Sequence, residues 1–92
     1  MKQTLEFLHP IDGDVLFSVA DGVVEGDGLR AEVAVSAAPA HKIQINGVPA
    51  TEKDGVYTAK VFLDGYRNAV EAADIETGET KTIYIYWFRN GY

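Results

Sequence analysis

The chain has 92 residues, of which 47% are hydrophobic, and a formal net charge of -6. This length suits one domain, and the hydrophobic content is enough for a core, which excludes an intrinsically disordered chain. The absence of cysteine excludes disulfides and thiolate chemistry. The eight basic residues are scattered singly, so the clustered Lys and Arg of nucleic-acid binding proteins are missing.

The first strand is predicted over residues 4–8, where Leu5 and Phe7 share one face. Pro10 ends this strand, since proline cannot donate a hydrogen bond to a sheet. Residues 15–19 form a second apolar alternation, which consists of Val15, Phe17 and Val19. We expect the two segments to be a single strand that switches from one sheet to the other.

Residues 21–28 are rich in glycine and acidic residues, which predicts a loop. Residues 29–36 alternate regularly and predict a half-buried antiparallel strand. Its inward residues are Leu29, Ala31, Val33 and Val35. Residues 37–40 include a proline and are expected to cross between two sheets.

The stretch 43–78 carries the clearest strand-and-turn pattern. Asn46-Gly47 favours a type I′ hairpin turn, because both central residues of that turn have positive φ. Asp54-Gly55 and Asp64-Gly65 mark further turns. Together these signals predict strands near 41–46, 48–52, 56–63 and 68–75. Turns recur about every 8–13 residues, which is typical of an antiparallel sandwich.

The last strand is predicted over residues 80–88, with Ile83, Ile85 and Trp87 facing the core. Alternation then turns Tyr84, Tyr86 and Phe88 outward as an aromatic row about 14 Å long. Three interpretations of this row stay open. It could pack across strands, dock against a following domain or another copy, or form a platform on which sugars stack.

No window shows a sustained 3.6-residue period, so helices are not expected beyond one short turn. The predicted fold is all-β, an immunoglobulin-like Greek-key sandwich of two antiparallel sheets with seven to eight strands. It forms one domain over residues 1–92, which we expect to be a piece of a longer chain or its N-terminal part.

The sequence offers little catalytic or metal-binding chemistry. Ser18 and Ser36 lie inside strand patterns, and a nucleophile needs a turn and a base beside it. His9 and His41 lack a third zinc ligand nearby. We therefore expect no enzyme activity in this domain, no metal and no cofactor. The uncharged stretches fall short of the ~20 apolar residues that span a bilayer, so no membrane segment is expected.

Acidic residues accumulate between Lys2 and Arg30, and we interpret them as turn and solvation residues, with calcium binding as the alternative. They are Glu6, Asp12, Asp14, Asp21, Glu25 and Asp27.

Asn68 is expected to hydrogen-bond the backbone of the Asp64-Gly65 corner. Tyr57 and Trp87 have inward parity and are assigned to the core.

The pattern of turns and alternating residues over roughly residues 5 to 88 resembles bacterial immunoglobulin-like modules of surface and carbohydrate-active enzymes, such as those of glucodextranase-type and polysaccharide deacetylase-type proteins. The pattern is a hairpin Asn-Gly, then Asp-Gly-x-aromatic, a Leu, a turn glycine, an Asn, alternating small apolar residues, an Asp and a glycine. Its residues are Ile43, Ile45, Asn46, Gly47, Asp54, Gly55, Tyr57, Leu63, Gly65, Asn68, Val70, Ala72, Asp74 and Gly78. The opening EFLHPIDGDV is similar to the first strand of that family.

The resemblance implies a non-catalytic accessory or spacer domain that positions a neighbouring, carbohydrate-directed catalytic domain. The alternative is a self-standing glycan-binding or adhesion module that uses the exposed aromatics of the last strand. The expected partners are a neighbouring domain, another copy or a polysaccharide. The compartment stays open, since no signal peptide is recognised. It would be extracellular if the domain comes from a secreted parent, and cytoplasmic otherwise.

Overall fold

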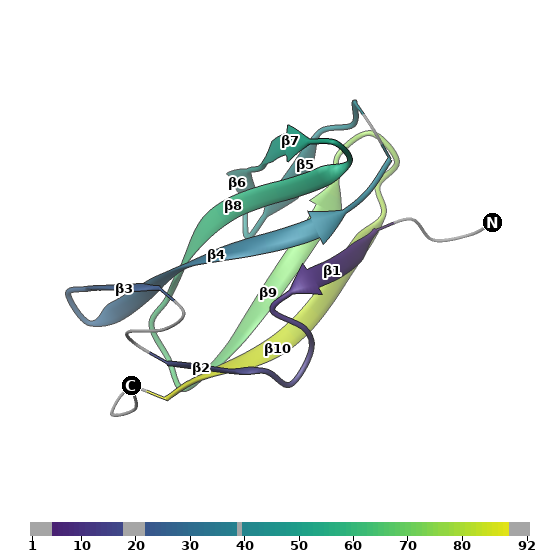
Figure 1. Ribbon diagram of the computed structural model, residues 1–92. Helices are drawn as coiled ribbons and strands as arrows, with labels where there is room; N and C mark the ends of the chain where they lie inside the picture. Colours follow the sequence, from purple (N-terminus) through teal and green to yellow (C-terminus); the bar gives the residue numbers. More distant parts are fainter. Residues whose placement is uncertain (1–4, 18–21, 39, 89–92) are drawn as a thin grey trace.

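The computed structural model describes residues 5–17, 22–38 and 40–88, with Phe88 described by its backbone alone. Within these ranges the chain forms ten strands and no helix, arranged as two packed sheets (Figure 1). The all-β prediction is therefore confirmed. No helix of the described part is long and apolar enough to cross a membrane.

The first sheet, sheet A, contains five strands in the order β1-β4-β8-β7, with β3 pairing with β4. Their bounds are β1 Glu6–His9, β3 Val23–Glu25, β4 Gly28–Ser36, β7 Thr51–Lys53 and β8 Val56–Leu63. All the pairs in this sheet are antiparallel. Since β1 and β3 both pair with β4, they occupy opposite ends of it.

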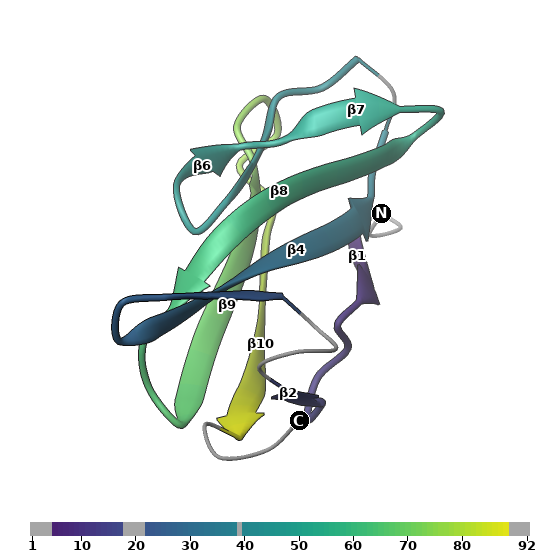
Figure 2. The same ribbon diagram turned by 60° about the vertical axis from the view of Figure 1, so that its left-hand side comes forward.

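The second sheet, sheet B, also contains five strands, in the order β2-β10-β9-β5-β6. Their bounds are β2 Val15–Phe17, β5 Ile43–Ile45, β6 Val48–Pro49, β9 Arg67–Asp74 and β10 Thr80–Phe88. The pairs are antiparallel except for β2 and β10, which run parallel. Figure 2 shows β4 and β8 of sheet A in front of β9 and β10 of sheet B.

The chain passes between the sheets at both edges of the sandwich. On one side β1 belongs to sheet A and the following β2 to sheet B, which confirms the predicted switch of the first strand. On the other side β6 pairs in sheet B and β7 in sheet A. The prediction of a single strand over 48–52 was wrong. Ala50 lies between the two short strands, and its amide donates to the carbonyl of Ile43 at 2.9 Å.

The core lies between the sheets and follows the predicted alternation in the long strands. Leu29, Ala31, Val33 and Val35 of β4 are all buried, as are Tyr57, Ala59, Val61 and Leu63 of β8. Sheet B contributes Ile43, Ile45, Val70, Ala72, Ile83, Ile85 and Trp87. Each strand thus has one apolar face, and burial of these faces is the main force that holds the sheets together.

Two predictions in the N-terminal part were wrong. In β2 the structure buries Leu16, while Val15 is 48% and Phe17 is 38% exposed. The short segment contains three consecutive apolar residues, so its pattern could not fix which parity faces inward. Val19 lies outside the described residues.

The acidic loop is also interrupted by a strand, because β3 forms a hairpin with the start of β4. Every residue of β3 is exposed. Its sequence therefore carries no alternation between buried and exposed positions, and pairing of the backbone with β4 is what makes it a strand.

Candidate functional site

Aromatic and apolar side chains gather on the outer face of sheet B. They come from β2, from β10 and from the residue before β9, and we call them the aromatic face: Val15, Phe17, Tyr66, Tyr84 and Tyr86. Tyr66 is 66% exposed and Tyr84 42%, and Tyr86 is half-buried. The predicted outward parity of Tyr84 and Tyr86 is confirmed. The side chain of Phe88 lies outside the described part of the structure.

Strand register brings these residues together. Tyr86 of β10 lies beside Val15 of β2 and Arg67 of β9, and Tyr84 lies beside Ala69. Laterally paired residues project from the same side of a sheet. Sequence reasoning found Tyr84 and Tyr86 from their own alternation, but it missed their neighbours from other strands.

The rings of the aromatic face pack against one another and against a cation. The centroids of Tyr66 and Tyr86 are 5.4 Å apart, with an angle of 55° between the ring planes. The guanidinium carbon of Arg67 lies 4.3 Å from the centroid of the Tyr84 ring. Such a cation–π contact stabilises by about 0.5–1 kcal/mol at an exposed site. Arg67 therefore covers part of Tyr84 and holds a positive charge within the aromatic face.

The loop before β2 holds the backbone of β10 at this site. The amide of Tyr84 donates to the Asp12 carboxylate at 2.8 Å, and its carbonyl accepts from the amide of Gly13 at 2.7 Å. The amide of Tyr86 donates to the carbonyl of Asp14 at 2.8 Å. Asp14 also closes its own loop, because its carboxylate accepts from the amide of Ile11 at 2.9 Å. Asp12 and Asp14 thus have structural roles, as the turn interpretation expected.

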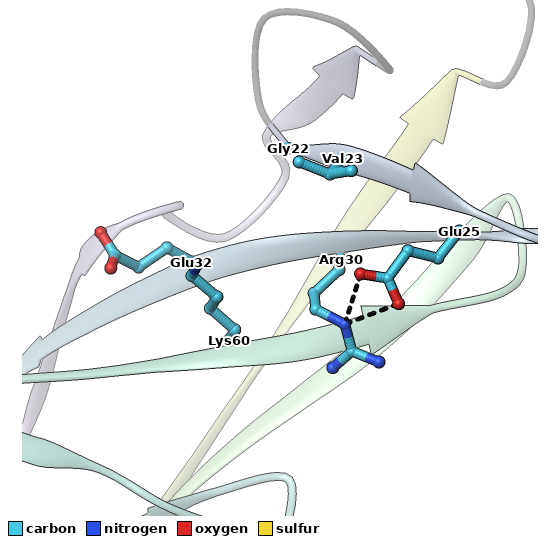
Figure 3. A pocket seen from close by; sticks show the side chains of 6 residues that line it. All are labelled: Gly22, Val23, Glu25, Arg30, Glu32 and Lys60. Carbon is cyan, nitrogen blue, oxygen red and sulfur yellow. Dashed lines mark hydrogen bonds and ion pairs between the residues drawn. The ribbon is translucent and has the colours of Figure 1, made fainter.

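A second candidate is a groove of about 280 Å³ on the outer side of sheet A (Figure 3). It is lined by Gly22, Val23, Glu25, Arg30, Glu32 and Lys60. Its charges are largely matched within the chain. Arg30 Nε lies 3.0 Å from both oxygens of Glu25, and Glu32 lies directly across from Lys60 in the register of β4 and β8.

A third candidate is a histidine–carboxylate pair at the opposite end of sheet B. His41 Nδ1 lies 2.7 Å from Asp74 Oδ2, and Asp74 is only 2% exposed. The hydrogen bond that His41 donates to the Asp74 carboxylate raises the pKa of His41 above its usual 6.5. Burial raises the pKa of Asp74, but hydrogen bonds from His41 and from the amides of Glu76 and Thr77 outweigh it and leave that pKa below 3.8.

The other predicted candidates lie apart from one another. His9 is exposed on β1, Ser36 ends β4, and Ser18 and Asp21 fall outside the described residues. Within the described ranges, no group of three or more His, Asp or Glu side chains is placed to hold a metal ion. Asn68 bonds the corner as expected, since its side chain accepts from the amide of Gly65 at 3.2 Å and donates to the carbonyl of Gly65 at 2.8 Å.

Comparisons of the chain with protein-family models, with curated proteins and with solved structures find no significant match. The functional argument therefore depends on the site itself. Of the three candidates, the aromatic face of sheet B contains the largest number of exposed large apolar side chains, which are Val15, Phe17, Tyr66 and Tyr84.

Proposed function

We propose that this protein is a non-catalytic accessory module with an immunoglobulin-like fold, which docks through the aromatic face of sheet B and thereby positions a neighbouring domain of its parent chain. The observation that supports this proposal is the aromatic face itself. Its apolar side chains are contiguous across β2, β10 and the start of β9, and four of them are 38–66% exposed. Contiguous exposed apolar surface on a soluble domain marks an interaction site.

The immunoglobulin-like assignment is supported by two packed, mainly antiparallel sheets and by connections that cross between them. The chain crosses from sheet A to sheet B after β1, β4 and β8. Crossing connections of this kind join the sheets of Greek-key sandwiches. That the neighbouring domain acts on carbohydrate is inferred from the resemblance of the turn pattern to modules of carbohydrate-active enzymes.

The non-catalytic part of the proposal is supported by the roles of the polar side chains. Asp12, Asp14 and Asn68 bond backbone groups of turns, and Asp74 accepts from two backbone amides and lies against His41. Groups that are already hydrogen-bonded in this way stabilise corners of the sandwich.

The alternative function is a glycan-binding or adhesion module that stacks sugars on the exposed tyrosines. The exposure of Tyr66 and Tyr84 favours it. The orientation of the side chains favours docking instead, because Arg67 covers Tyr84 and the Tyr66 and Tyr86 rings are tilted by 55°. A flat platform would need rings that are open and nearly coplanar.

Tyrosine nitration tests the proposal. Tyr66 and Tyr84 should react in the dilute 92-residue chain and should be protected in the full polypeptide that its gene encodes. Replacing both residues by serine should loosen the contact that this face makes in the full polypeptide, as measured by limited proteolysis. The matched control is Val23→Ser with Val24→Ser, which removes two exposed apolar side chains from β3 in sheet A.

Equal nitration in both forms would contradict docking. Retention of the chain on cellulose, chitin or xylan, lost in the tyrosine variant and kept in the valine control, would support the glycan-binding alternative instead.

A further inference from the structure

We infer that a second copy of this chain covers the aromatic face, in a two-fold symmetric dimer held by reciprocal ion pairs between Arg67 and Glu71. This inference rests on the proposed function, because it names the occupant of the docking surface. It would make the module a dimerisation element that brings two parent chains side by side.

The charges on β9 are arranged as a self-complementary pair. Arg67 and Glu71 are both exposed on the outer face of this strand, with Ala69 midway between them. Four residues of extended strand separate them by about 14 Å, too far for an ion pair within one chain. Neither forms an ion pair with another described residue. On sheet A, by contrast, Arg30 pairs with Glu25.

The positions of these two charges select the symmetry of the dimer. In a face-to-face pair, the two-fold axis lies in the plane between the two sheets. An axis that passes over Ala69 at right angles to β9 reverses the direction of this strand in the second copy. Arg67 of each copy then lies opposite Glu71 of the other. An axis along the strand would instead place Arg67 opposite Arg67, and like charges in contact disfavour a complex. Each ion pair occurs twice because a two-fold interface is self-complementary.

The shapes of the two ends of the face agree with the same rotation. Tyr86 lies in the row of Arg67, and Thr82 lies in the row of Glu71. The rotation therefore places the bulky Tyr86 of one copy against the smaller Thr82 of the other. Tyr84 lies in the row of Ala69, which the rotation maps onto itself, so the two Arg67-covered Tyr84 side chains meet around the axis. Large side chains facing small ones allow two sheets to pack closely.

Analytical ultracentrifugation of the wild type and of charge-reversed variants tests whether the dimer forms through these ion pairs. The wild-type chain should sediment with twice its 10.0 kDa mass at high concentration. Arg67→Glu alone places acidic residues opposite each other, and Glu71→Arg alone does the same with basic residues. Each variant should raise the dimer dissociation constant at least about tenfold. An equimolar mixture of the two variants should form a heterodimer, because both contacts then join opposite charges.

The controls separate charge pairing from misfolding and from net charge. The double variant Arg67→Glu with Glu71→Arg should regain the homodimer if both single variants fold. Lys60→Glu and Glu32→Arg change the net charge equally but lie on sheet A, so they should leave the wild-type dissociation constant unchanged.

A wild-type chain that stays monomeric at millimolar concentration would overturn the inference. So would a dimer that ignores both single substitutions, or a mixture that fails to associate. A monomeric chain whose tyrosines are protected in the full polypeptide would refute the dimer and leave the proposed docking function standing.

Discussion

The buried carboxylate of Asp74 shows how one polar residue organises a corner of this sandwich. One of its oxygens accepts from the amides of Glu76 and Thr77 at 3.0 and 3.2 Å, and the other lies 2.7 Å from His41 Nδ1. The hydroxyl of Tyr57 adds to this corner by accepting from the amide of His41 at 3.2 Å. A buried carboxylate is tolerated here because each oxygen has a partner.

This pair predicts a specific pH dependence of stability. The folded pKa of His41 is raised above 6.5, so its contribution is complete below pH 6.5 and is lost as the pH rises through the raised value. The folded pKa of Asp74 is lowered from 3.8, so its contribution is present above pH 3.8 and is lost as the pH falls through the lowered value. The pair should therefore stabilise the folded state most between pH 3.8 and pH 6.5.

Thermal unfolding of the wild type and of His41→Ala across pH measures the effect. The difference in Tm should be largest in that window and should shrink towards alkaline pH. His9→Ala, which removes an exposed histidine of β1, is the matched control. A Tm difference for His41→Ala that is constant from pH 4 to 9 would refute the assignment.

Gly47 illustrates a residue whose importance comes from backbone conformation alone. It follows Asn46 in the β5–β6 turn, with φ of +79° after +51°, and a Cβ placed on it would touch nothing within 4 Å. We expect Gly47→Val to lower the free energy of unfolding by at least about 1 kcal/mol, because a β-branched side chain disfavours positive φ. Gly47→Asn should cost less, since asparagine tolerates this region. Equal urea midpoints for the wild type and the valine variant would contradict the turn assignment.

At the level of elements, the clarity of alternation decided how well each strand could be predicted. In β4 the four predicted inward residues, Leu29, Ala31, Val33 and Val35, alternate with more exposed positions, and in β8 the same alternation predicted the inward Tyr57. In β2 three apolar residues follow one another, so the parity was mistaken. β3 is recognisable only through its pairing with β4, which a pattern within one segment cannot reveal.

The edge of β10 depends on the loop that precedes β2, and Asp12 is its key contact. Asp12→Ala removes the acceptor of the Tyr84 amide. We expect this amide to exchange hydrogen faster and the free energy of unfolding to fall by about 1 kcal/mol, since the acceptor is charged but exposed. Hydrogen exchange resolved by residue measures both.

Asp14→Ala is the matched control, because it removes only the bond to Ile11 and leaves the backbone bond from Tyr86 intact. Unchanged protection of Tyr84 in Asp12→Ala would show that the Asp12 carboxylate does not hold this strand.

For the whole molecule, the sequence predicted two sheets and an outward aromatic row, but not the composition of the candidate site. Tyr84 and Tyr86 follow from a two-residue period. Tyr66 and Val15 join them through strand register and the parallel pairing of β2 with β10. Register depends on long-range pairing, which local patterns do not encode. In the sequence, Arg67 is one of eight basic residues that are scattered singly. Its contact with Tyr84 is evident only from the three-dimensional structure.

The net charge of -6 raises the question whether the acidic N-terminal part binds calcium, and we predict that it does not. Asp12 and Asp14 already accept backbone hydrogen bonds, and Glu25 pairs with Arg30. A ligand that binds only the folded state stabilises it by RT ln(1 + [L]/Kd), so a weak site leaves Tm unchanged.

Millimolar calcium chloride should therefore raise the Tm no more than sodium chloride of equal ionic strength, which screens the repulsion among the carboxylates in the same way. Differential scanning calorimetry in both salts provides the measurement, and magnesium chloride is a control for divalent charge. A rise of several degrees with calcium alone would show that these carboxylates rearrange around the ion, because a selective effect cannot come from screening.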